Sequence, residues 1–267
     1  MRIALGQFGA GADKRENLER MTTFAASAAR AGADLVVFPE AAMAGGEPGA
    51  DLTPFAEPID GPFATGLAEA AAHHRIAVVA GMFEPGSPER VYNTVVAFGP
   101  DGALLGSYRK IHLYDAFGGR ESDRIQPGDG ATLVFQLGGL KFGVMTCYEL
   151  RFPEIARHLV ERGADVLLLP AAWVRGSLKE LHWETLARAR AIENTVYLAA
   201  SGQVSDRSIG LSAIFDPMGV MIVSAGETEG VTTGEVTPER LAEVRRTNPS
   251  LAMRRPDVYA SWQPIRR

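Results

Sequence analysis

Short apolar runs alternate with longer amphipathic segments along this chain, and that alternation restricts its fold more than any other feature. Most runs carry Val, Ile and Leu on both faces, as strands covered on both sides do. In the longer segments apolar residues recur at helical spacing, for example Phe152, Ile155, Ala156 and Leu159. Buried strands alternating with amphipathic helices predict an α/β protein built in layers. The predicted strands are Ile3–Phe8, Leu35–Phe38, Ile76–Phe83, Thr94–Phe98, Thr132–Gln136, Phe142–Cys147, Val166–Leu169, Thr195–Ala200, Ser212–Phe215, Met221–Ser224 and Thr232–Val236.

A second predicted helix has Leu18, Met21 and Ala25 on one face. A third is predicted from about Leu178 to Asn194. The late strands are separated by short turns, such as the Asp-Pro-Met-Gly sequence at 216–219. Such turns favour antiparallel hairpins within a mixed sheet. Long loops are expected at 44–54 and 114–130, and long loops in compact domains are often functional.

Length and composition indicate one domain. Single domains stop growing at roughly 250–300 residues, and this chain has 267, of which 22% are charged. We therefore predict a single domain over residues 1–267. The stretch 248–267 lacks clear periodicity but contains Tyr259 and Trp262. We expect it to be an extension docked on the domain or on a dimer partner.

Charge and cysteine content limit the partners. The formal charge is −5 and no basic stripe is present, so we expect no nucleic-acid partner. No run approaches the ~20 apolar residues of a membrane span, and the N-terminal run is too short for a signal peptide. The single cysteine cannot form an internal disulfide, which suits a reducing compartment. We predict a cytoplasmic protein with no membrane partner.

Neither a metal nor a cofactor is expected. The five histidines show no metal-ligand spacing, and a metal site needs three or four converging ligands. The Gly-Ala-Gly sequence at 9–11 follows a strand but lacks the third glycine of a dinucleotide-binding loop.

Cys147 lies where a predicted strand meets a predicted helix, since Pro153 suits the first turn of a helix. Ligands bind open α/β sheets at the carboxyl ends of strands. A helix start also carries partial positive charge, which favours a thiolate. The alternative is that Cys147 is a small buried apolar residue, although the polar neighbours Tyr148 and Glu149 argue against a core position.

Partners for a reactive thiol are found at two other strand ends. Glu40 directly follows the apolar strand at 35–38, and Lys110 follows an apolar stretch. A carboxylate can accept the proton of the thiol, and a cation can stabilise negative charge. Taken singly, Glu40 could begin an ordinary loop and Lys110 could be a surface cation. No histidine stands in a cysteine-protease signature.

Together these motifs resemble the nitrilase, or carbon–nitrogen hydrolase, superfamily. The matching stretches spread along the chain in the order that the family has. Within that family, the segment after the cysteine is similar to the Nit-type amidases, which include ω-amidases and deaminated-glutathione amidases. Many of those have Asp where this chain has Glu149. The matching stretches are Ile3–Gln7, Phe38–Glu40, Tyr108–Leu113, Cys147–Glu154 and Leu169–Trp173.

The resemblance implies a four-layer α-β-β-α sandwich, with two mixed β-sheets packed face to face and helices outside, paired into a homodimer or higher homo-oligomer. It implies a catalytic triad of Glu40, Lys110 and Cys147, and Glu121 is the best match for a second glutamate. The implied reaction converts a small aliphatic or dicarboxylic monoamide to a carboxylate and ammonia through a cysteine thioester. A nitrilase or an N-carbamoyl amidohydrolase is the alternative, and a catalytically silent dimeric binding protein is a further one.

Four other residues are candidates for the substrate pocket. The backbone N–H of Tyr148 is placed to stabilise an oxyanion with Lys110, and Trp173 and the ring of Tyr148 are expected to line the pocket. Arg151 could bind a substrate carboxylate, but pairing with Glu149 or with the glutamate at 154 is favoured from their spacing. Arg175 is another candidate contact for a carboxylate.

Overall fold

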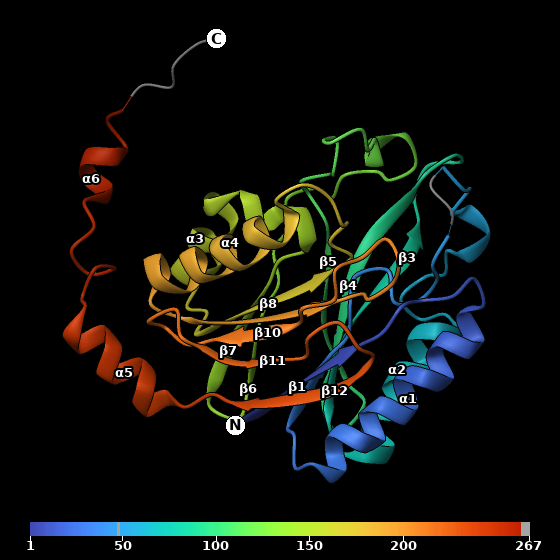
Figure 1. Ribbon diagram of the computed structural model, residues 1–267, viewed down its shortest axis with the longest axis horizontal. Coiled ribbons are helices and arrows are strands. Elements are labelled where there is room, and N and C mark those ends of the chain that lie inside the picture. The colour runs from blue at the N-terminus through green and yellow to red at the C-terminus, as the bar shows by residue number, and fades with distance from the viewer. Residues whose placement is uncertain (47–48, 263–267) are drawn as a thin grey trace.

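The computed structural model describes residues 1–46 and 49–262, and its strands form two six-stranded sheets (Figure 1). The sheets have matching pairing patterns: in each, three adjacent strands pair in parallel and every other pairing is antiparallel. The first sheet has the order β12 (Gly230–Glu235), β1 (Arg2–Gln7), β2 (Leu35–Val37), β3 (Ala77–Pro85), β4 (Val91–Phe98), β5 (Leu104–Arg109). The second has the order β11 (Met221–Ser224), β10 (Ala213–Phe215), β9 (Tyr197–Gly202), β8 (Val166–Ala171), β7 (Leu140–Val144), β6 (Val134–Leu137).

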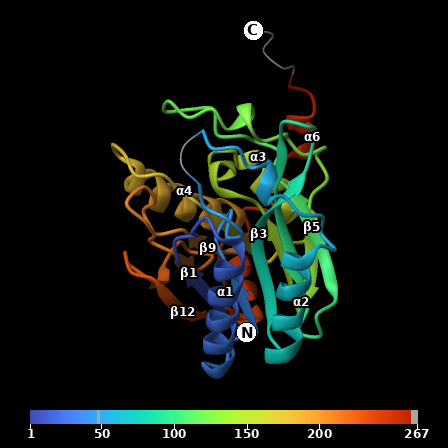
Figure 2. The same ribbon diagram turned by 90° about the vertical axis from the view of Figure 1, so that its right-hand side faces the viewer.

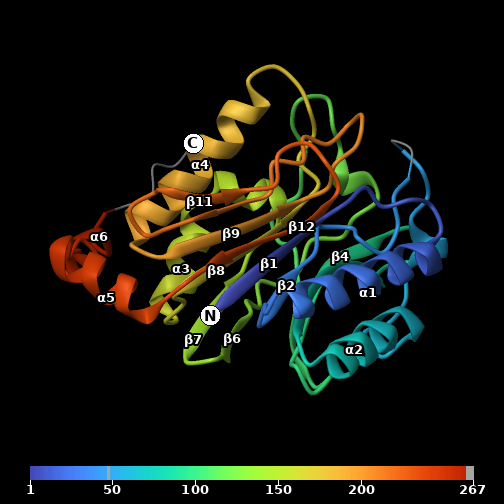
Figure 3. The same ribbon diagram turned by 60° about the horizontal axis from the view of Figure 1, so that its bottom comes forward.

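Helices cover the outer faces of both sheets. Figure 3 shows α1 and α2 on the opposite side of the sheets from α3 and α4. The predicted four-layer sandwich is therefore confirmed. The helices are α1 (Lys14–Arg30), α2 (Pro62–His74), α3 (Pro153–Glu161), α4 (Lys179–Asn194), α5 (Pro238–Thr247) and α6 (Pro256–Tyr259), with 3-10 turns η1 (Thr53–Phe55), η2 (Glu121–Asp123) and η3 (Cys147–Arg151). None of the helices in the described residues is long and apolar enough to cross a membrane.

The alternation of side chains along the strands explains the layers. Ile3 and Leu5 of β1 point into the core that the two sheets share, whereas Ala4 between them packs with the residues of α1 and α2. The same alternation places Leu35 and Val37 in the shared core and Val36 outside it. Successive side chains of a strand point to opposite faces, so a strand buried on both faces is apolar throughout.

Several predicted boundaries were wrong. The strand expected to reach Cys147 ends at Val144, because Thr146 begins a capping box and Cys147 starts η3. Helices α2 and α5 and strand β5 were not predicted. α2 is rich in alanine and so lacks a strong apolar stripe. Strand β5 lies at the edge of its sheet and is largely exposed, so it lacks a continuous apolar run.

The end of the chain leaves the sheets and passes along the margin of the molecule as α5 and α6 (Figure 1). Leu251 packs against the shared core, and Arg254 forms an ion pair with Glu161 of α3. Beyond that point the rings of Tyr259 and Trp262 contact each other at a tilt of 49°, with centroids 5.0 Å apart, and are exposed. Residues 263–267 of the predicted extension, and 47–48 of the predicted loop 44–54, lie outside the described residues.

Strand direction brings the predicted site residues to one edge. β2, β7 and β8 lead to Glu40, Cys147 and Ala172 at their carboxyl ends. β5 is two antiparallel steps from β3, so it runs in the same direction as β3 and ends beside Lys110. The loop between β5 and β6, which carries Glu121, crosses the top of the molecule (Figure 2).

Candidate active site

Glu40, Lys110 and Cys147 meet at this edge. Lys110 Nζ lies 2.8 Å from Glu40 Oε1, and the Cys147 thiol is close enough to the same carboxylate for the two groups to shift each other's pKa. All three side chains are buried, with Lys110 only 1% exposed. The other oxygen, Glu40 Oε2, accepts the backbone N–H of Ala172 at 2.8 Å. The carboxylate of Glu40 is thus bound to residues from both sheets.

Glu121 is the second acidic partner of Lys110. Its two carboxylate oxygens lie 3.0 and 2.8 Å from Lys110 Nζ. The backbone N–H of Tyr114 donates to Glu121 Oε2 at 2.5 Å, which fixes the carboxylate across the loop that carries it. The structure therefore brings all four residues predicted as catalytic into one cluster, in which one ammonium lies between two carboxylates.

The environment shifts the pKa values of the three central groups. Burial raises the pKa of Glu40, but the Lys110 charge and the hydrogen bonds from Lys110, Cys147 and Asn93 outweigh it and leave the pKa lowered. Burial lowers the pKa of Lys110, but Glu121 and Glu40 outweigh it and raise the pKa well above its ordinary value. At neutral pH, Glu40 is therefore a carboxylate and Lys110 an ammonium.

The Cys147 thiol differs from the sequence prediction. Burial raises its pKa well above the ordinary value, the Glu40 charge raises it further, and Lys110 only partly opposes them. The predicted enrichment in thiolate was therefore wrong for the free protein. The helix start near the thiol is only the five-residue η3, since α3 begins at Pro153. A neutral thiol beside an ionised carboxylate can give up its proton during attack.

Unusual backbone geometry supports both strand ends. Cys147 has φ of 46° and Ala41, directly after Glu40, has φ of 52°. Non-glycine residues in this left-handed region cost of order 1–3 kcal/mol and concentrate at functional sites. The turn at Glu40 also packs tightly on β3. A Cβ at Gly81 would lie 2.8 Å from Glu40 Cα and 2.5 Å from Ala41 N, so this position requires glycine.

Asn93 belongs to the cluster and was missed from the sequence. Its side-chain Nδ2 donates to Glu40 Oε1 at 2.8 Å and to Glu121 Oε1 at 3.1 Å. Its backbone oxygen accepts the N–H of Lys110 at 2.9 Å. The predicted strand began one residue later, at Thr94. The available signal was a polar Asn-Thr pair inside an otherwise apolar strand, since buried polar groups need partners.

Glu149 connects the cysteine turn to the lysine segment. It is fully buried, and its Oε2 accepts the backbone N–H of Thr146 at 2.7 Å. Its Oε1 accepts the Tyr108 hydroxyl at 2.6 Å and the backbone N–H of Ile111 at 3.0 Å. Glu149 has one methylene more than aspartate. Its carboxylate thus completes the capping box of η3 and also accepts hydrogen bonds from the segment around Lys110.

The other residues predicted to line the substrate pocket lie in different surroundings. Trp173 is buried, and its Nε1 donates to the backbone oxygen of Lys179 at 2.9 Å, while Tyr148 is half-buried beside Tyr114. Arg175 does not face the cluster, since it pairs with Glu227 at 3.3 Å.

The favoured pairing of Arg151 with Glu149 or with the glutamate at 154 was wrong. The oxygens of Glu149 are occupied by other donors, and η3 ends at Arg151, so helical spacing does not continue to position 154. Arg151 instead lies 4.9 Å from the centroid of the Trp173 ring.

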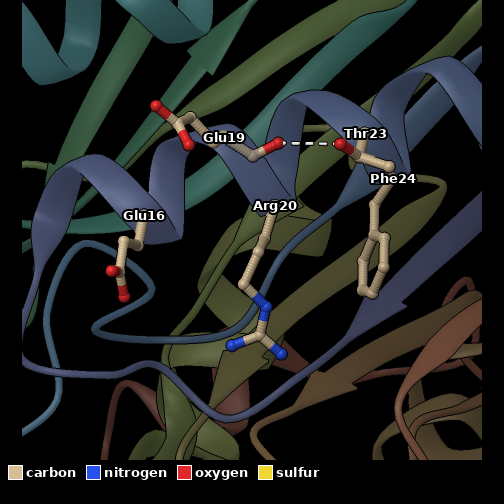
Figure 4. Close-up of a pocket in the computed structure, with 5 residues that line it drawn as sticks. All are labelled: Glu16, Glu19, Arg20, Thr23 and Phe24. Carbon is tan, nitrogen blue, oxygen red and sulfur yellow. Dashed lines mark hydrogen bonds between the residues drawn. The ribbon is translucent and has the colours of Figure 1, made fainter.

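A separate surface hollow lies beside α1, far along the chain from the cluster. It is lined by Glu16, Glu19, Arg20, Thr23 and Phe24 (Figure 4). Arg20 is already ion-paired with Glu229 and donates to the backbone oxygen of Gly9. The hollow therefore offers no unpaired cation to a ligand.

A buried cysteine beside an ionised carboxylate and an ammonium is the arrangement expected of a hydrolase that acts through a thiol. The carbon-nitrogen hydrolase family model matches residues 2–246, and the chain belongs to this family. It is 40% identical over 96% of its length to a deaminated glutathione amidase of Escherichia coli O157:H7, and covers 97% of that protein. It is 33% identical to an omega-amidase of Homo sapiens, with 97% of this chain and 96% of that one covered.

Solved structures agree. An amidase from Nesterenkonia sp. AN1 aligns with a TM-score of 0.84 and 28% identity, covering 98% of this chain and all of the other. That structure is described as carrying acrylamide added at its active site cysteine. The nitrilase-superfamily resemblance is thereby confirmed, and the protein is an amidohydrolase, an enzyme that cleaves carbon–nitrogen bonds of amides.

Proposed function

We propose that the chain hydrolyses a small primary amide with Cys147 as nucleophile, Glu40 as proton shuttle and Lys110 as electrostatic partner. One observation carries this proposal: a single buried carboxylate, that of Glu40, is hydrogen-bonded to the ammonium of Lys110 and interacts with the only thiol, so that each shifts the pKa of the other. An ionised carboxylate beside a thiol can accept its proton as the sulfur attacks.

The chemistry follows from the protonation states. As Cys147 Sγ attacks the amide carbon, Glu40 accepts the thiol proton. Glu40 then delivers this proton to the departing nitrogen, the C–N bond breaks, and ammonia leaves a thioester on Cys147. Water, deprotonated by Glu40, attacks the thioester, and the thiol regains its proton as the carboxylic acid is released. The sum is one amide and one water converted to a carboxylic acid and ammonia.

The oxyanion is bound by Lys110 and by a backbone N–H. Lys110 donates to Glu40 Oε1 at 2.8 Å and to the two oxygens of Glu121 at 3.0 and 2.8 Å, so a substrate oxygen replaces the longer contact to Glu121. The N–H of Tyr148, the second residue of η3, lacks an intrahelical partner by position, and no acceptor among the described residues takes it. Removing one oxyanion donor typically costs about 2.7–4 kcal/mol in barrier.

The proposed substrate is a small aliphatic amide or the monoamide of a dicarboxylic acid. The names of two relatives, a deaminated glutathione amidase and an omega-amidase, support an amide as the substrate. Tyr148 and Trp173 are proposed to line the acyl pocket.

Ammonia release measures the proposal directly. Succinamate, glutaramate, butanamide, N-carbamoyl amino acids and the matching nitriles are incubated with the wild type and with Cys147→Ala. We expect ammonia from amides only, and none from the variant, while its circular dichroism and melting temperature match the wild type. Turnover of nitriles without amides indicates a nitrilase. Carbon dioxide released with ammonia indicates a carbamoyl hydrolase. Full activity of the folded alanine variant would falsify the triad.

We further propose a homodimer or higher homo-oligomer in the cytoplasm, with the whole chain forming one domain. The exposed Met253, Tyr259 and Trp262 support docking of the extension 248–267 on a second copy. The lone cysteine supports a reducing compartment. Light scattering of the full chain and of a chain ending at 249 is the test. A full chain that is monomeric at micromolar concentration contradicts the proposal.

A further inference from the structure

Lys179 is a cation that the reaction described above does not use. It is the first residue of α4 and only 3% exposed, although lysine is rarely buried without a partner. Its Nζ lies over three aromatic rings, 4.8 Å from Tyr114, 4.6 Å from Phe117 and 4.7 Å from Trp173. Its one hydrogen bond, to the Tyr114 hydroxyl, is long at 3.4 Å.

Arg151 occupies the same aromatic surroundings. Its guanidinium lies 4.9 Å from the ring of Trp173 and 5.2 Å from that of Phe117, the rings that also contact Lys179. Its Nη2 contacts His182 Nδ1 at 3.3 Å, and its buried Nε has no hydrogen-bond partner. Two cations therefore share one aromatic enclosure, and one of them has an unused buried donor.

Neither cation has an acidic partner in the part of the chain that the structure describes. No carboxylate within 4.0 Å pairs with Lys179 or Arg151, although most other buried cations here are paired. Burial lowers the pKa of Lys179, and the positive charge of Arg151 lowers it further, while Glu180 opposes this only weakly. Holding two like charges together without a counterion is costly, and an incoming anion removes that cost.

The cation pair is connected to the reacting groups through two residues. The backbone N–H of Tyr114 binds Glu121, and the ring of Tyr114 contacts both Lys179 and the ring of Tyr148. On the other side, Trp173 is next to Ala172, whose N–H binds Glu40. The Cys147 thiol is also near enough to Lys179 for a negative charge on the sulfur to raise the pKa of the lysine. We therefore expect a molecule bound at the thiol to have its far end close to the cations.

We propose that Lys179, together with Arg151, binds a carboxylate at the end of the substrate remote from the scissile amide, and that Lys179 determines the preference for acidic amides. This inference rests on the proposed amidohydrolase function. It specifies that the acyl part of the substrate ends in a carboxylate and that neutral amides of the same length are poorer substrates. The planar guanidinium of Arg151 and the compact ammonium of Lys179 provide complementary donors to the two oxygens.

Matched substrate pairs test the inference. Succinamate differs from butanamide, and glutaramate from pentanamide, only in carrying a carboxylate in place of a terminal methyl group. We expect the wild type to favour the acid of each pair in kcat/KM. Lys179→Met should lower that ratio by about tenfold or more, chiefly through KM, as the loss of a charged contact of at least 1.4 kcal/mol does. Lys179→Arg should restore most of it.

Arg175→Met is the matched control. Arg175 is close in sequence to Lys179 but pairs with Glu227, so its replacement should leave the ratio unchanged. A ratio that is the same in Lys179→Met and in the wild type overturns the inference, as does an equal loss in Arg175→Met.

Binding separates this inference from the function it rests on. Glutarate is titrated calorimetrically into Cys147→Ala and into the double variant with Lys179→Met. We expect glutarate to bind the first at least about tenfold more tightly than the second, and pentanoate to bind both weakly. If the wild type releases no ammonia from any amide, the proposed function fails. The difference in glutarate affinity between the two variants still tests whether Lys179 and Arg151 bind a carboxylate. Equal glutarate affinity in the two variants overturns the cation pair even where turnover is normal.

Discussion

Asn93→Ala tests how the two glutamates of the active site are held, because one amide nitrogen donates to both. The bonds are 2.8 Å to Glu40 and 3.1 Å to Glu121, and Asn93 is buried. A hydrogen bond to a charged group contributes about 1.5–3 kcal/mol. Taking the lower value for each, since both carboxylates keep Lys110, the variant should lose about 3 kcal/mol of unfolding free energy at neutral pH.

The pH dependence of kcat/KM tests the bond between Asn93 and Glu40 more specifically than the loss of stability does. The pKa of Glu40 lies below its ordinary value partly because Asn93 donates to its charged form. Losing that donor raises the pKa, so the acid limb of kcat/KM should move to higher pH, with plateau activity lower by about tenfold. A carboxylate with a lowered pKa stabilises the fold above its unfolded pKa, and this stabilisation is lost as pH falls through the folded pKa. The deficit of the variant should therefore shrink in acid.

Asn17→Ala is the matched control for this experiment. Asn17 is equally buried, but its Nδ2 donates to the backbone oxygens of Gly11 and Met43, at 2.8 and 3.0 Å, and to no carboxylate. Urea unfolding should show a comparable loss of stability, while the acid limb stays in place. If the acid limb of the Asn93 variant coincides with that of the wild type, the reasoning is refuted.

The remaining predictions concern the other charged groups of the site. Lys110→Met should abolish amide turnover and also cost about 3–5 kcal/mol of stability at pH 7, because Glu40 and Glu121 are left buried without their cation; a melting temperature equal to that of the wild type contradicts this. Since Glu40 becomes protonated in acid, the cost should fall as the pH is lowered. Glu40→Gln should abolish turnover and lower the pKa of the Cys147 thiol, because the Glu40 charge raises that pKa in the wild type. The rate of thiol alkylation measured against pH gives the direction of the pKa change, and a shift to higher pH contradicts the prediction. Glu149→Gln should cost about 2 kcal/mol in urea unfolding, because four donors converge on this carboxylate, and an unchanged midpoint is the contrary result.

The sequence could predict the residues at the ends of strands but not the contacts between them. Glu40 and Cys147 follow apolar strands, and the family motifs contain both, so their meeting could be expected. Asn93 lies inside a strand, where nothing local shows that its amide faces two carboxylates. Nothing in the sequence distinguishes Lys179 from a surface lysine at the start of a helix. Its burial depends on how aromatic rings from distant segments are arranged in the folded chain.

Arg151 shows why a spacing rule failed. Pairing at (i, i+3) assumes a continuous helix, but the chain turns at Phe152 between η3 and α3. The neighbouring Glu149 is instead directed inward by its capping box. The raised pKa of the Cys147 thiol was missed for a related reason, since it depends on depth of burial, and sequence shows only which charges are nearby.

The attachment of Glu40 to both sheets has a consequence for folding. Its side chain binds Ala172, and its backbone oxygen accepts the amide of Gln203 at 2.8 Å, so partners 132 and 163 residues away hold one catalytic group. Contacts of such long sequence separation are the slow ones to form. A refolding chain should therefore recover secondary structure well before it recovers catalysis. The rate at which enzymatic activity returns then measures the final docking of one sheet on the other.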